Sequence, residues 1–468
     1  MIRRPLVFAL ALALLPASAF AEDLLQTYEL ARISDPQLSA AESQRLATRE
    51  GAVQARAAML PQINGTATLQ RTRSSGESSQ TQFDPATGAP IQFDVGRESE
   101  TTSRNLDVNA RQMVYDRANF TRLKSQNALS KASDFQLESA GDTLITRTSQ
   151  AYFNVLVATE TLAAAEAQEA ALKKQFDFAD KRLEVGLAPI TDVHEARAQY
   201  DSARANTIVV RNALEDAYQA LVELTGVPVR NLKGLPDDFK PALPIEQAAE
   251  GWVNSAIENN PALIAKKFQV ESSEANVETA RAGHWPSLYV SGGYGDQRSF
   301  GDSTTRGITF PSDSDSRGPR IGLTLNVPIF SGGAVQSQVR QAIAQRDVAQ
   351  DELEQQKRAL VRNTRNAYQT LLAGISEVEA RRLAVFSARS AYEASQVGLE
   401  VGTRTVLDVL NNQRTLFDAE RQYALARYNF LQNRLLLEQA AGTLDVADVR
   451  DVNGLLTVTP EARLRSAP

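Results

Sequence analysis

The chain has 468 residues, of which 43% are hydrophobic and 23% charged, and its 50 Lys and Arg against 56 Asp and Glu give a net charge of -6. This balance argues against a nucleic-acid binder with a broad basic face. With no cysteine and only His194 and His284, the composition excludes thiol, disulfide and iron–sulfur chemistry and leaves little for a catalytic triad or a multi-histidine metal site.

Residues 1–21 have the three parts of an export signal. Arg3 and Arg4 form a positive start, the stretch from Leu6 to Leu15 is apolar, and Ala19-Phe20-Ala21 is a cleavage motif. The apolar stretch is shorter than the ~20 residues that cross a bilayer as a helix. We therefore expect a signal peptide over residues 1–21 that is removed on export.

The remaining sequence is a duplication. Leu183-Glu184-Val185-Gly186 returns as Leu399-Glu400-Val401-Gly402, and Asp35-Pro36 returns as Asn260-Pro261. Two copies are too few for a solenoid, so the pattern predicts one duplicated structural unit. The expected divisions are a first repeat over 22–226, a linker over 227–247, a second repeat over 248–442 and a tail over 443–468.

Each repeat is predicted to open with a helix and continue as two strands around a loop. The helices are expected over about 37–59 and 261–283, and loops rich in Gly, Ser, Asp and Pro over about 73–100 and 296–317. The strands alternate apolar and polar residues, as in Ile321 to Val327, which is typical of a half-buried strand. We expect four strands per chain of about ten residues each.

A very long helix and a shorter returning helix close each repeat. Residues 116–185 and 332–401 contain no proline, and a straight helix of that size would reach ~105 Å. Both end at Val-Gly, and the returning helices are expected over about 190–226 and 405–441. Apolar residues recur every seventh position in the returning helix, which predicts left-handed coiled-coil packing.

These elements predict a mainly α fold with β structure that is completed by assembly. A transmembrane barrel needs at least eight strands, so the four strands of one chain cannot close one. Open sheet edges are unfavourable in lipid and prone to aggregation in water. Symmetric assembly of three chains would bring twelve strands together and remove the edges.

Several runs of residues resemble the TolC family of outer-membrane channel tunnels. They include Tyr152-Phe153-Asn154-Val155-Leu156, Ile190-Thr191-Asp192-Val193 and the run from Val401 to Leu410. The resemblance covers about residues 22–456. It implies a homotrimer with a 12-stranded β-barrel among the lipids of the outer membrane, a 12-helix periplasmic α-barrel, and an equatorial belt that includes 227–247 and the tail.

The resemblance also implies a function. The chain would form the exit duct for efflux of small molecules, for type I protein secretion, or for both. Its periplasmic end would open when an adaptor and an inner-membrane ABC, RND or MFS transporter dock. No cofactor, metal or nucleic acid is expected, and no enzyme motif is present. A periplasmic coiled-coil adaptor or scaffold stays as the alternative, although it would not need two amphipathic strand pairs.

The two turns between the long helices are the candidate functional sites. The two copies diverge there, because Ala188 stands opposite Arg404. Arg404 and Asp408 are four residues apart, which places them on one helix face. In a trimer, an axial carboxylate appears three times, and three carboxylates at a narrow mouth favour cations.

The resemblance gives roles to residues of these turns. It implies an entrance ring at Asp408 and Asn411, where Asn411 replaces the family's second aspartate and should weaken cation selectivity. It implies gate-closing bonds from Arg404, Thr191 and Asp192. Leu399 replaces the tyrosine expected to partner Asp192, so the gate should open more easily. The adaptor-docking tips are expected at Gly186, Leu187, Gly402 and Thr403.

Overall fold

The computed structural model describes residues 23–187, 189–243, 247–305 and 308–460, so the expected signal peptide over 1–21 lies outside the described residues. The chain divides into two compact units. The strand unit comprises Leu46–Lys131 and Phe268–Asp351, and the helical unit comprises the other described residues. Each unit takes segments from both halves of the duplicated sequence.

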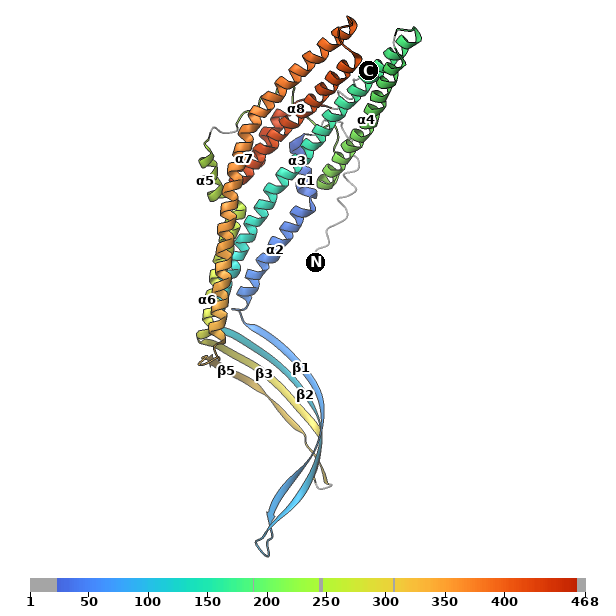
Figure 1. Ribbon diagram of the computed structural model, residues 1–468. Coiled ribbons are helices and arrows are strands. Elements are labelled where there is room, and N and C mark those ends of the chain that lie inside the picture. The colour runs from blue at the N-terminus through green and yellow to red at the C-terminus, as the bar shows by residue number, and fades with distance from the viewer. Residues whose placement is uncertain (1–22, 188, 244–246, 306–307, 461–468) are drawn as a thin grey trace, which may run out of the picture. The chain divides into compact units, whose positions relative to one another are not determined.

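The strands form one antiparallel sheet within the strand unit. Strand β1 pairs with β2, β2 with β3, and β3 with both β4 and β5, which leaves β1 at one edge and β4 and β5 at the other (Figure 1). The bounds are Gln62–Phe83 for β1, Pro90–Tyr115 for β2, Ser287–Thr305 for β3, Ile308–Pro311 for β4 and Ser314–Asn326 for β5.

The strands are longer than predicted, and the predicted loop over 73–100 is wrong. Strands β1 and β2 have 22 and 26 residues, and they stay paired from Gln62 opposite Arg111 to Phe83 opposite Pro90. The turn is confined to Asp84–Ala89, where Gly88 has a φ of +67°. Backbone hydrogen bonds hold such a pair of strands together without an alternating pattern of apolar side chains. The alternation in the sequence therefore ended before the strands did.

The second predicted loop, over 296–317, is also largely strand. Strand β3 has 19 residues and runs through Thr305. The fourth predicted strand lies within β5, whereas β4 falls inside the predicted loop, and both β4 and β5 pair with β3.

The sheet has two chemically distinct faces. Ile63 stands opposite Ala110, Ala110 opposite Gly292, and Gly292 opposite Ile321. Residues opposed in antiparallel strands point to the same side, so this register defines an apolar face and a polar face. Exposed large apolar residues of the apolar face include Ile63, Leu69, Leu106, Val108, Tyr294, Ile321, Leu323 and Leu325, and further toward the turns Phe300 and Phe83. Members of the polar face include Gln62, Asn64, Thr66, Asp107, Asn109, Ser291 and Arg320. The predicted alternation is confirmed.

Four long helices form two antiparallel pairs, α3 with α4 and α7 with α8 (Figure 1). Their bounds are Arg117–Glu184 for α3, Ile190–Thr225 for α4, Ala334–Glu400 for α7 and Val406–Ala441 for α8. These bounds confirm the predicted helices to within two residues. Among the described helices, none combines the length and the apolar composition needed to cross a bilayer.

Short helices precede and follow the long ones. Helices α2 (Pro36–Ala57) and α6 (Pro261–Arg281) confirm the predicted helices, and α6 continues into the short 3-10 helix η2 (Ala282–His284). Helices α1 (Leu24–Ser34), α5 (Ala249–Asn259) and α9 (Val446–Leu455) were not predicted. Asp35 and Asn260 adopt extended backbone before the prolines, which separates α1 from α2 and α5 from α6.

The core of the helical unit surrounds an aromatic and ionic cluster. Tyr428 stacks on Phe153 at 5.9 Å between ring centroids, and its hydroxyl donates to Glu160 Oε1 at 2.9 Å. Arg427 Nη2 lies 2.7 Å from Glu160 Oε2. Burial and the neighbouring Glu160 charge raise the pKa of Tyr428 above its ordinary value, so the phenol stays neutral and donates.

The predicted linker and tail meet beside this cluster. Gly234 and Val458 form a backbone bridge with N–O distances of 2.5 and 3.1 Å. Arg427 Nη1 donates to Pro236 O at 3.1 Å, which ties the same segment to α8.

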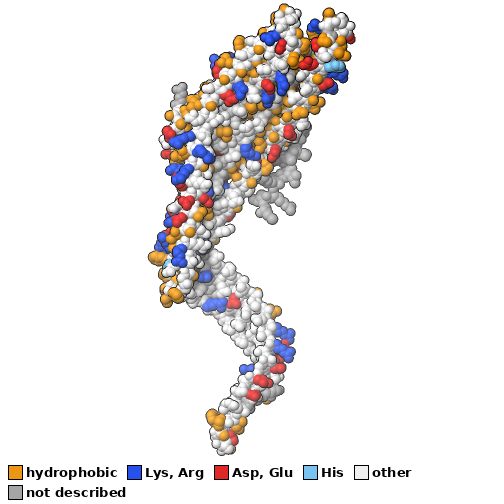
Figure 2. All heavy atoms as spheres, in the orientation of Figure 1, with side chains coloured by type: hydrophobic (Ala, Val, Ile, Leu, Met, Phe, Trp, Pro, Cys, Tyr) orange, Lys and Arg blue, Asp and Glu red, His pale blue; other side chains and the backbone are white. Residues whose placement is uncertain are grey.

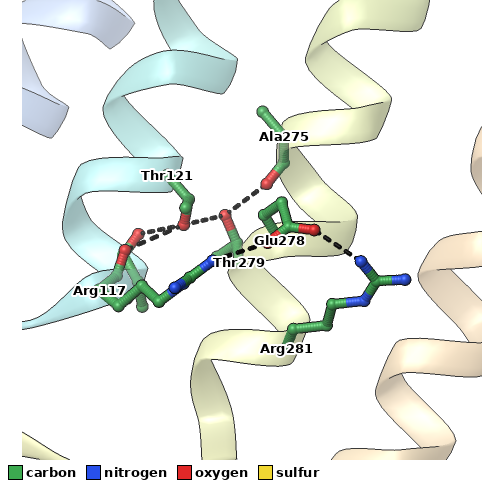
Figure 3. Close-up of polar contacts among 7 residues, drawn as sticks. Arg117, Thr121, Ala275, Glu278, Thr279 and Arg281 are labelled. Carbon is green, nitrogen blue, oxygen red and sulfur yellow. Dashed lines mark hydrogen bonds and ion pairs between the residues drawn. The ribbon is translucent and has the colours of Figure 1, made fainter. Parts of the chain in front are cut away.

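Within the strand unit, a polar seam joins the start of α3 to the end of α6 (Figure 3). Arg117 Nη2 donates to Glu278 Oε2 at 3.0 Å, and Arg281 Nη1 donates to Glu278 Oε1 at 2.7 Å. These arginines, Arg117 foremost, hold the pKa of Glu278 below its usual range. Thr279 Oγ1 donates to Thr121 Oγ1 at 2.8 Å. The seam fixes two helices at the points where the chain enters and leaves the sheet.

Candidate functional site

The two tips of the helical hairpins share one backbone form. Gly186 and Gly402 have φ values of +74° and +76°. In each tip the glycine N–H bonds to a carbonyl three residues back, and the next N–H bonds to one five residues back. This is the Schellman arrangement, which ends a helix with a left-handed glycine. The duplicated Val-Gly pair therefore forms the same tight reversal twice.

The helices that follow the two turns start differently. At α8, Thr405 is the N-cap: its N–H and Oγ1 bond to Asp408 Oδ2 at 3.0 and 2.9 Å, and Asp408 N–H returns to Thr405 Oγ1 at 3.2 Å. At α4 the N-cap is Pro189, which makes no side-chain cap. Asp192 holds the same third helical position as Asp408; its N–H donates to Pro189 O at 3.2 Å, but its carboxylate makes no hydrogen bond or ion pair among the described residues.

The Thr405 contacts change the electrostatics of Asp408. The backbone N–H and the hydroxyl of Thr405, with a smaller contribution from the Arg404 charge, hold the pKa of Asp408 below its usual range. Asp408 therefore stays ionised at neutral pH. A carboxylate near a helix N-terminus also interacts favourably with the helix dipole.

The prediction that Arg404 and Asp408 share a helix face is wrong. Helix α8 begins at Val406, so Arg404 precedes the N-cap and belongs to the turn. Its N–H donates to Gly398 O at 3.1 Å, and that carbonyl also accepts from Thr403 N at 2.8 Å. Arg404 is thus held against the last turn of α7.

The remaining predicted residues lie near the tips but are not joined to one another. Asn411 and Thr191 are exposed, while Asp192 and Leu399 are partly buried. Among the described residues of this one chain, no hydrogen bond or ion pair links Arg404 to Thr191 or Asp192. Ala188 lies outside the described residues.

The tips also carry exposed aliphatic side chains. Val185, Leu187 and Ile190 are exposed on the first tip, and Val401 and Leu407 on the second. Hydrophobic side chains are visible at the ends of both hairpins (Figure 2). Exposed apolar groups gathered at one place mark an interaction surface.

Sequence reasoning missed two residues of the site, Gly398 and Thr405. Thr405 and Asp408 have the spacing of a capping box, a signal that was available in the sequence. Gly398 is a glycine inside a predicted helix, and its partner Arg404 could not be known without the turn geometry. Among the described residues, no cluster of three or more histidine or acidic side chains could hold a metal ion.

Comparison with known proteins agrees with the fold and the sequence. The profile of the family described as "Outer membrane efflux protein" matches residues 27–227 and 252–443. The outer membrane protein TolC of Vibrio cholerae is 34% identical over 454 residues, covering 97% of this chain and 98% of that protein. TolC of Escherichia coli is 34% identical over 457 residues, covering 97% and 89%.

A secretion protein and solved channel structures are also similar. The alkaline protease secretion protein AprF of Pseudomonas aeruginosa is 29% identical, covering 95% of this chain and 89% of that protein. The outer-membrane channel OprN has a TM-score of 0.70 at 20% identity, covering 90% of each chain. The Campylobacter jejuni channel CmeC has a TM-score of 0.71 at 17% identity, covering 93% and 90%. The chain therefore belongs to the outer membrane efflux protein family.

Proposed function

We propose that this chain assembles as a homotrimer that forms an exit duct through the outer membrane, for efflux of small molecules, for type I protein secretion, or for both. The observation that carries the proposal is the sheet of the strand unit. Its apolar face is exposed, its other face is polar, and β1 and β5 are open edges. In lipid, unpaired strand edges cannot persist, so the edges must be paired with those of other copies.

Three copies give a closed structure of the right size. The strand courses β1, β2, β3 and β5 of three chains supply twelve strands, and even-numbered barrels of this kind span outer membranes. The apolar face would contact lipid and the polar face would line the lumen. Helices α3, α4, α7 and α8 of three chains would supply the 12-helix periplasmic barrel.

The periplasmic entrance is proposed at the hairpin tips. Asp408 would form the entrance ring, with Asn411 one helical turn further on in place of a second carboxylate. Arg404, Thr191 and Asp192 would form closing bonds between or within protomers, and Leu399 would leave one such link unmade. The uncapped start of α4 supports this, because the Asp192 carboxylate has no competing partner in its own chain among the described residues.

The tips also suit docking of other proteins. Gly186, Leu187, Gly402 and Thr403 would contact a periplasmic adaptor, whose inner-membrane partner would be an ABC, RND or MFS transporter. The exposed aliphatic side chains of both tips support this role. Similar proteins are described as protease secretion proteins and as a cobalt-zinc-cadmium resistance protein, so both classes of substrate are represented among the relatives.

The alternative of a periplasmic adaptor or scaffold is disfavoured by the same sheet. A scaffold in water would not benefit from exposed large apolar side chains on one face of four strands. The location in the outer membrane follows from the family.

Cross-linking tests the trimer directly, since the chain has no cysteine of its own. Each variant chain carries two cysteines, one in each edge strand. Ile63→Cys in β1 is combined with Ile321→Cys, Leu323→Cys or Leu325→Cys in β5, and the protein is oxidised in isolated outer membranes. We expect at least one pair to give a trimer that reductant returns to monomer. Monomer or an open ladder of multimers from every pair would contradict the closed barrel.

Two further experiments test the gate and the cargo. Arg404→Ser should raise single-channel conductance, and a wild-type trace would reject Arg404 as a closing residue. Deletion of the gene should be scored together for drug sensitivity and for loss of secreted proteins. A strain that is unchanged in both would contradict the role as an exit duct.

A further inference from the structure

Arginines replace apolar side chains at a similar level along the sheet. On the apolar face of β1, Leu69 is the last aliphatic residue, and arginines follow at the next two positions of that face. On β2, β3 and β5 the apolar runs likewise give way to charged residues. The arginines of this face, here called the arginine belt, are Arg71, Arg73, Arg104, Arg298 and Arg317, and all are exposed.

The belt marks one limit of the apolar face. From Ile63 to Leu69 the strand extends roughly 20 Å at about 3.4 Å per residue, which the 35–45° tilt of a barrel strand converts to roughly 15 Å of height. An outer-membrane barrel carries an outward apolar band ~25 Å tall. The belt lies on the side of the hairpin turns, away from the ends of the strands that join the helices. It therefore stands where a lipid bilayer would give way to headgroups.

Two members of the belt oppose each other directly. The register places Arg104 of β2 opposite Arg298 of β3, where facing Cβ atoms are only ~5 Å apart and like charges destabilise the pair. Arg298 Nε has distant carboxylate neighbours, Asp296 at 3.6 Å and Asp315 at 3.8 Å. Arg104 has no carboxylate within ion-pair distance among the described residues.

The rows of the sheet that hold the belt carry five arginines and four carboxylates, which are Glu100, Asp296, Asp302 and Asp315. Arg71 pairs with Glu100, but Arg73, Arg104 and Arg317 have no ion-pair partner in the described part of the chain. Asp302 has no ion-pair partner among the described residues either, and the same holds for Glu98 and Glu77, which lie on this face nearer the turn between β1 and β2. Basic side chains gather with acidic ones beside them on the strand unit (Figure 2). Arg104 lacks such a carboxylate in the part of the chain that the structure describes and faces Arg298, so an anion bound between the two guanidinium groups would reduce their repulsion.

We propose that the arginine belt, centred on Arg104 and Arg298, binds the phosphate groups of an anionic lipid in the outer leaflet. The inference rests on the proposed function, which puts the apolar face in the outer membrane and the hairpin turns outside the cell. Guanidinium groups bind phosphate through paired charge-assisted hydrogen bonds. The adjoining apolar face accommodates the acyl chains of the same lipid, so one surface recognises both ends of the molecule.

The test compares two substitutions in full-length protein. Arg104→Gln with Arg298→Gln removes the facing pair. Arg97→Gln is the matched control, because Arg97 is an exposed arginine of the same strand β2 that points to the polar face. The proteins are reconstituted in nanodiscs of phosphatidylcholine with either bisphosphorylated or dephosphorylated lipid A, extracted in mild detergent, and weighed by native mass spectrometry.

We expect wild type and Arg97→Gln to retain the bisphosphorylated lipid over the dephosphorylated one by about tenfold, and the double variant to lose that preference. An undiminished preference in the double variant would overturn the proposal. Single-channel recordings on the same samples separate the two claims. A conducting wild type without phosphate preference refutes the belt and leaves the proposed function intact, whereas a wild type that forms no channel overturns both.

Discussion

Arg404 lies against the bare α-carbon of Gly398 in the last turn of α7. A β-carbon on Gly398 would stand 2.6 Å from Arg404 Cγ and 3.2 Å from Arg404 Cβ. The backbones of the two residues are also joined, since Arg404 N donates to Gly398 O at 3.1 Å. The absence of a side chain at position 398 is therefore what allows the arginine to lie along the helix end.

Gly398→Ala should displace the Arg404 side chain without removing it. Alanine favours a helix over glycine by about 1 kcal/mol, so α7 itself stays folded. If Arg404 closes the entrance, Gly398→Ala should raise single-channel conductance as Arg404→Ser does. The matched control is Gly374→Ala in the same helix, where an added methyl meets Phe430 at an ordinary 3.4 Å. Wild-type conductance in Gly398→Ala, beside a raised value in Arg404→Ser, would contradict this packing.

Thr405→Ala should loosen the start of α8. It removes the hydroxyl that bonds to both the carboxylate and the N–H of Asp408. Loss of an N-cap corresponds to roughly fivefold faster hydrogen exchange in the first turn. Exchange of backbone amides, read by mass spectrometry, measures it. Peptides from the first turn of α4, which Pro189 leaves uncapped, serve as the internal reference and should not change.

The first turn of α8 should also become less stable in acid. Because the folded state holds the pKa of Asp408 below the ordinary 3.8, its contribution is complete above pH 3.8 and is lost as the pH falls through the lowered value. The protection of the first turn of α8, measured as exchange relative to the intrinsic amide rate at each pH, should therefore fall only below pH 3.8. Asp408→Asn, which cannot titrate, should show no such step; an identical step in that variant would assign the effect to another group.

The hairpin tips show which parts of a candidate site the sequence can predict. The Gly186 and Gly402 reversals follow from a duplicated Val-Gly pair, and glycine tolerates the positive φ that both need. The position of Arg404 could not be predicted from the sequence in this way. The four-residue spacing to Asp408 places the two side chains on one face only if both lie in the helix, and α8 starts at Val406. The hydrogen bonds across a turn depend on which residue is the N-cap of the next helix. A shift of the helix start by one residue is enough to take a side chain off the helix face.

Gly293→Ala should weaken the sheet. Arg320 of β5 reaches across β3 to Asp107 and Asn109 of β2, with Nη2–O distances of 2.7 Å to each. A β-carbon on Gly293 would lie 2.7 Å from Asn109 Oδ1 and 3.2 Å from Arg320 Nε, which breaks this bridge. The temperature at which the proposed trimer dissociates on a denaturing gel should fall. Gly318→Ala, whose methyl meets nothing within 4 Å, should leave that temperature unchanged.

Glu438 should make the helical unit less stable as the pH rises. Burial, reinforced by the Asp448 charge and opposed by Arg434 at 3.2 Å, raises the pKa of Glu438 from 4.5 to about 7. The folded state then binds the proton more tightly than the unfolded state, so stability falls between pH 4.5 and about 7 and is level above. The melting temperature of wild type should be lower at pH 8 than at pH 5.

Glu438→Gln should reduce that difference, because the amide has no proton to lose. The control is Glu354→Gln, an exposed glutamate paired with Arg358 at 2.8 Å, which should keep the wild-type dependence on pH. An unchanged pH dependence in Glu438→Gln would show that a different group titrates.

The fold could be predicted where a sequence pattern repeats along an element, and could not be predicted where no such pattern is present. Long proline-free segments with sevenfold apolar spacing fixed the four long helices. The outer parts of β1 and β2 carry Ser, Thr and Gln on both faces, so no period-two pattern marked them. Helices α1 and α5 are 11 residues each, and tertiary packing rather than propensity stabilises helices that short. Gly293 and Arg320 meet only through strand register, which no single segment encodes.

The ionic selectivity of single channels in planar bilayers tests the central claim, that three copies of this chain form a conduit whose periplasmic mouth is ringed by Asp408. Reversal potentials under a salt gradient give the ratio of cation to anion permeability. Asp408→Ala should lower that ratio relative to wild type, and Asn411→Asp, which adds a second carboxylate one helical turn on, should raise it. An Asp408→Ala channel with the wild-type ratio would contradict the account.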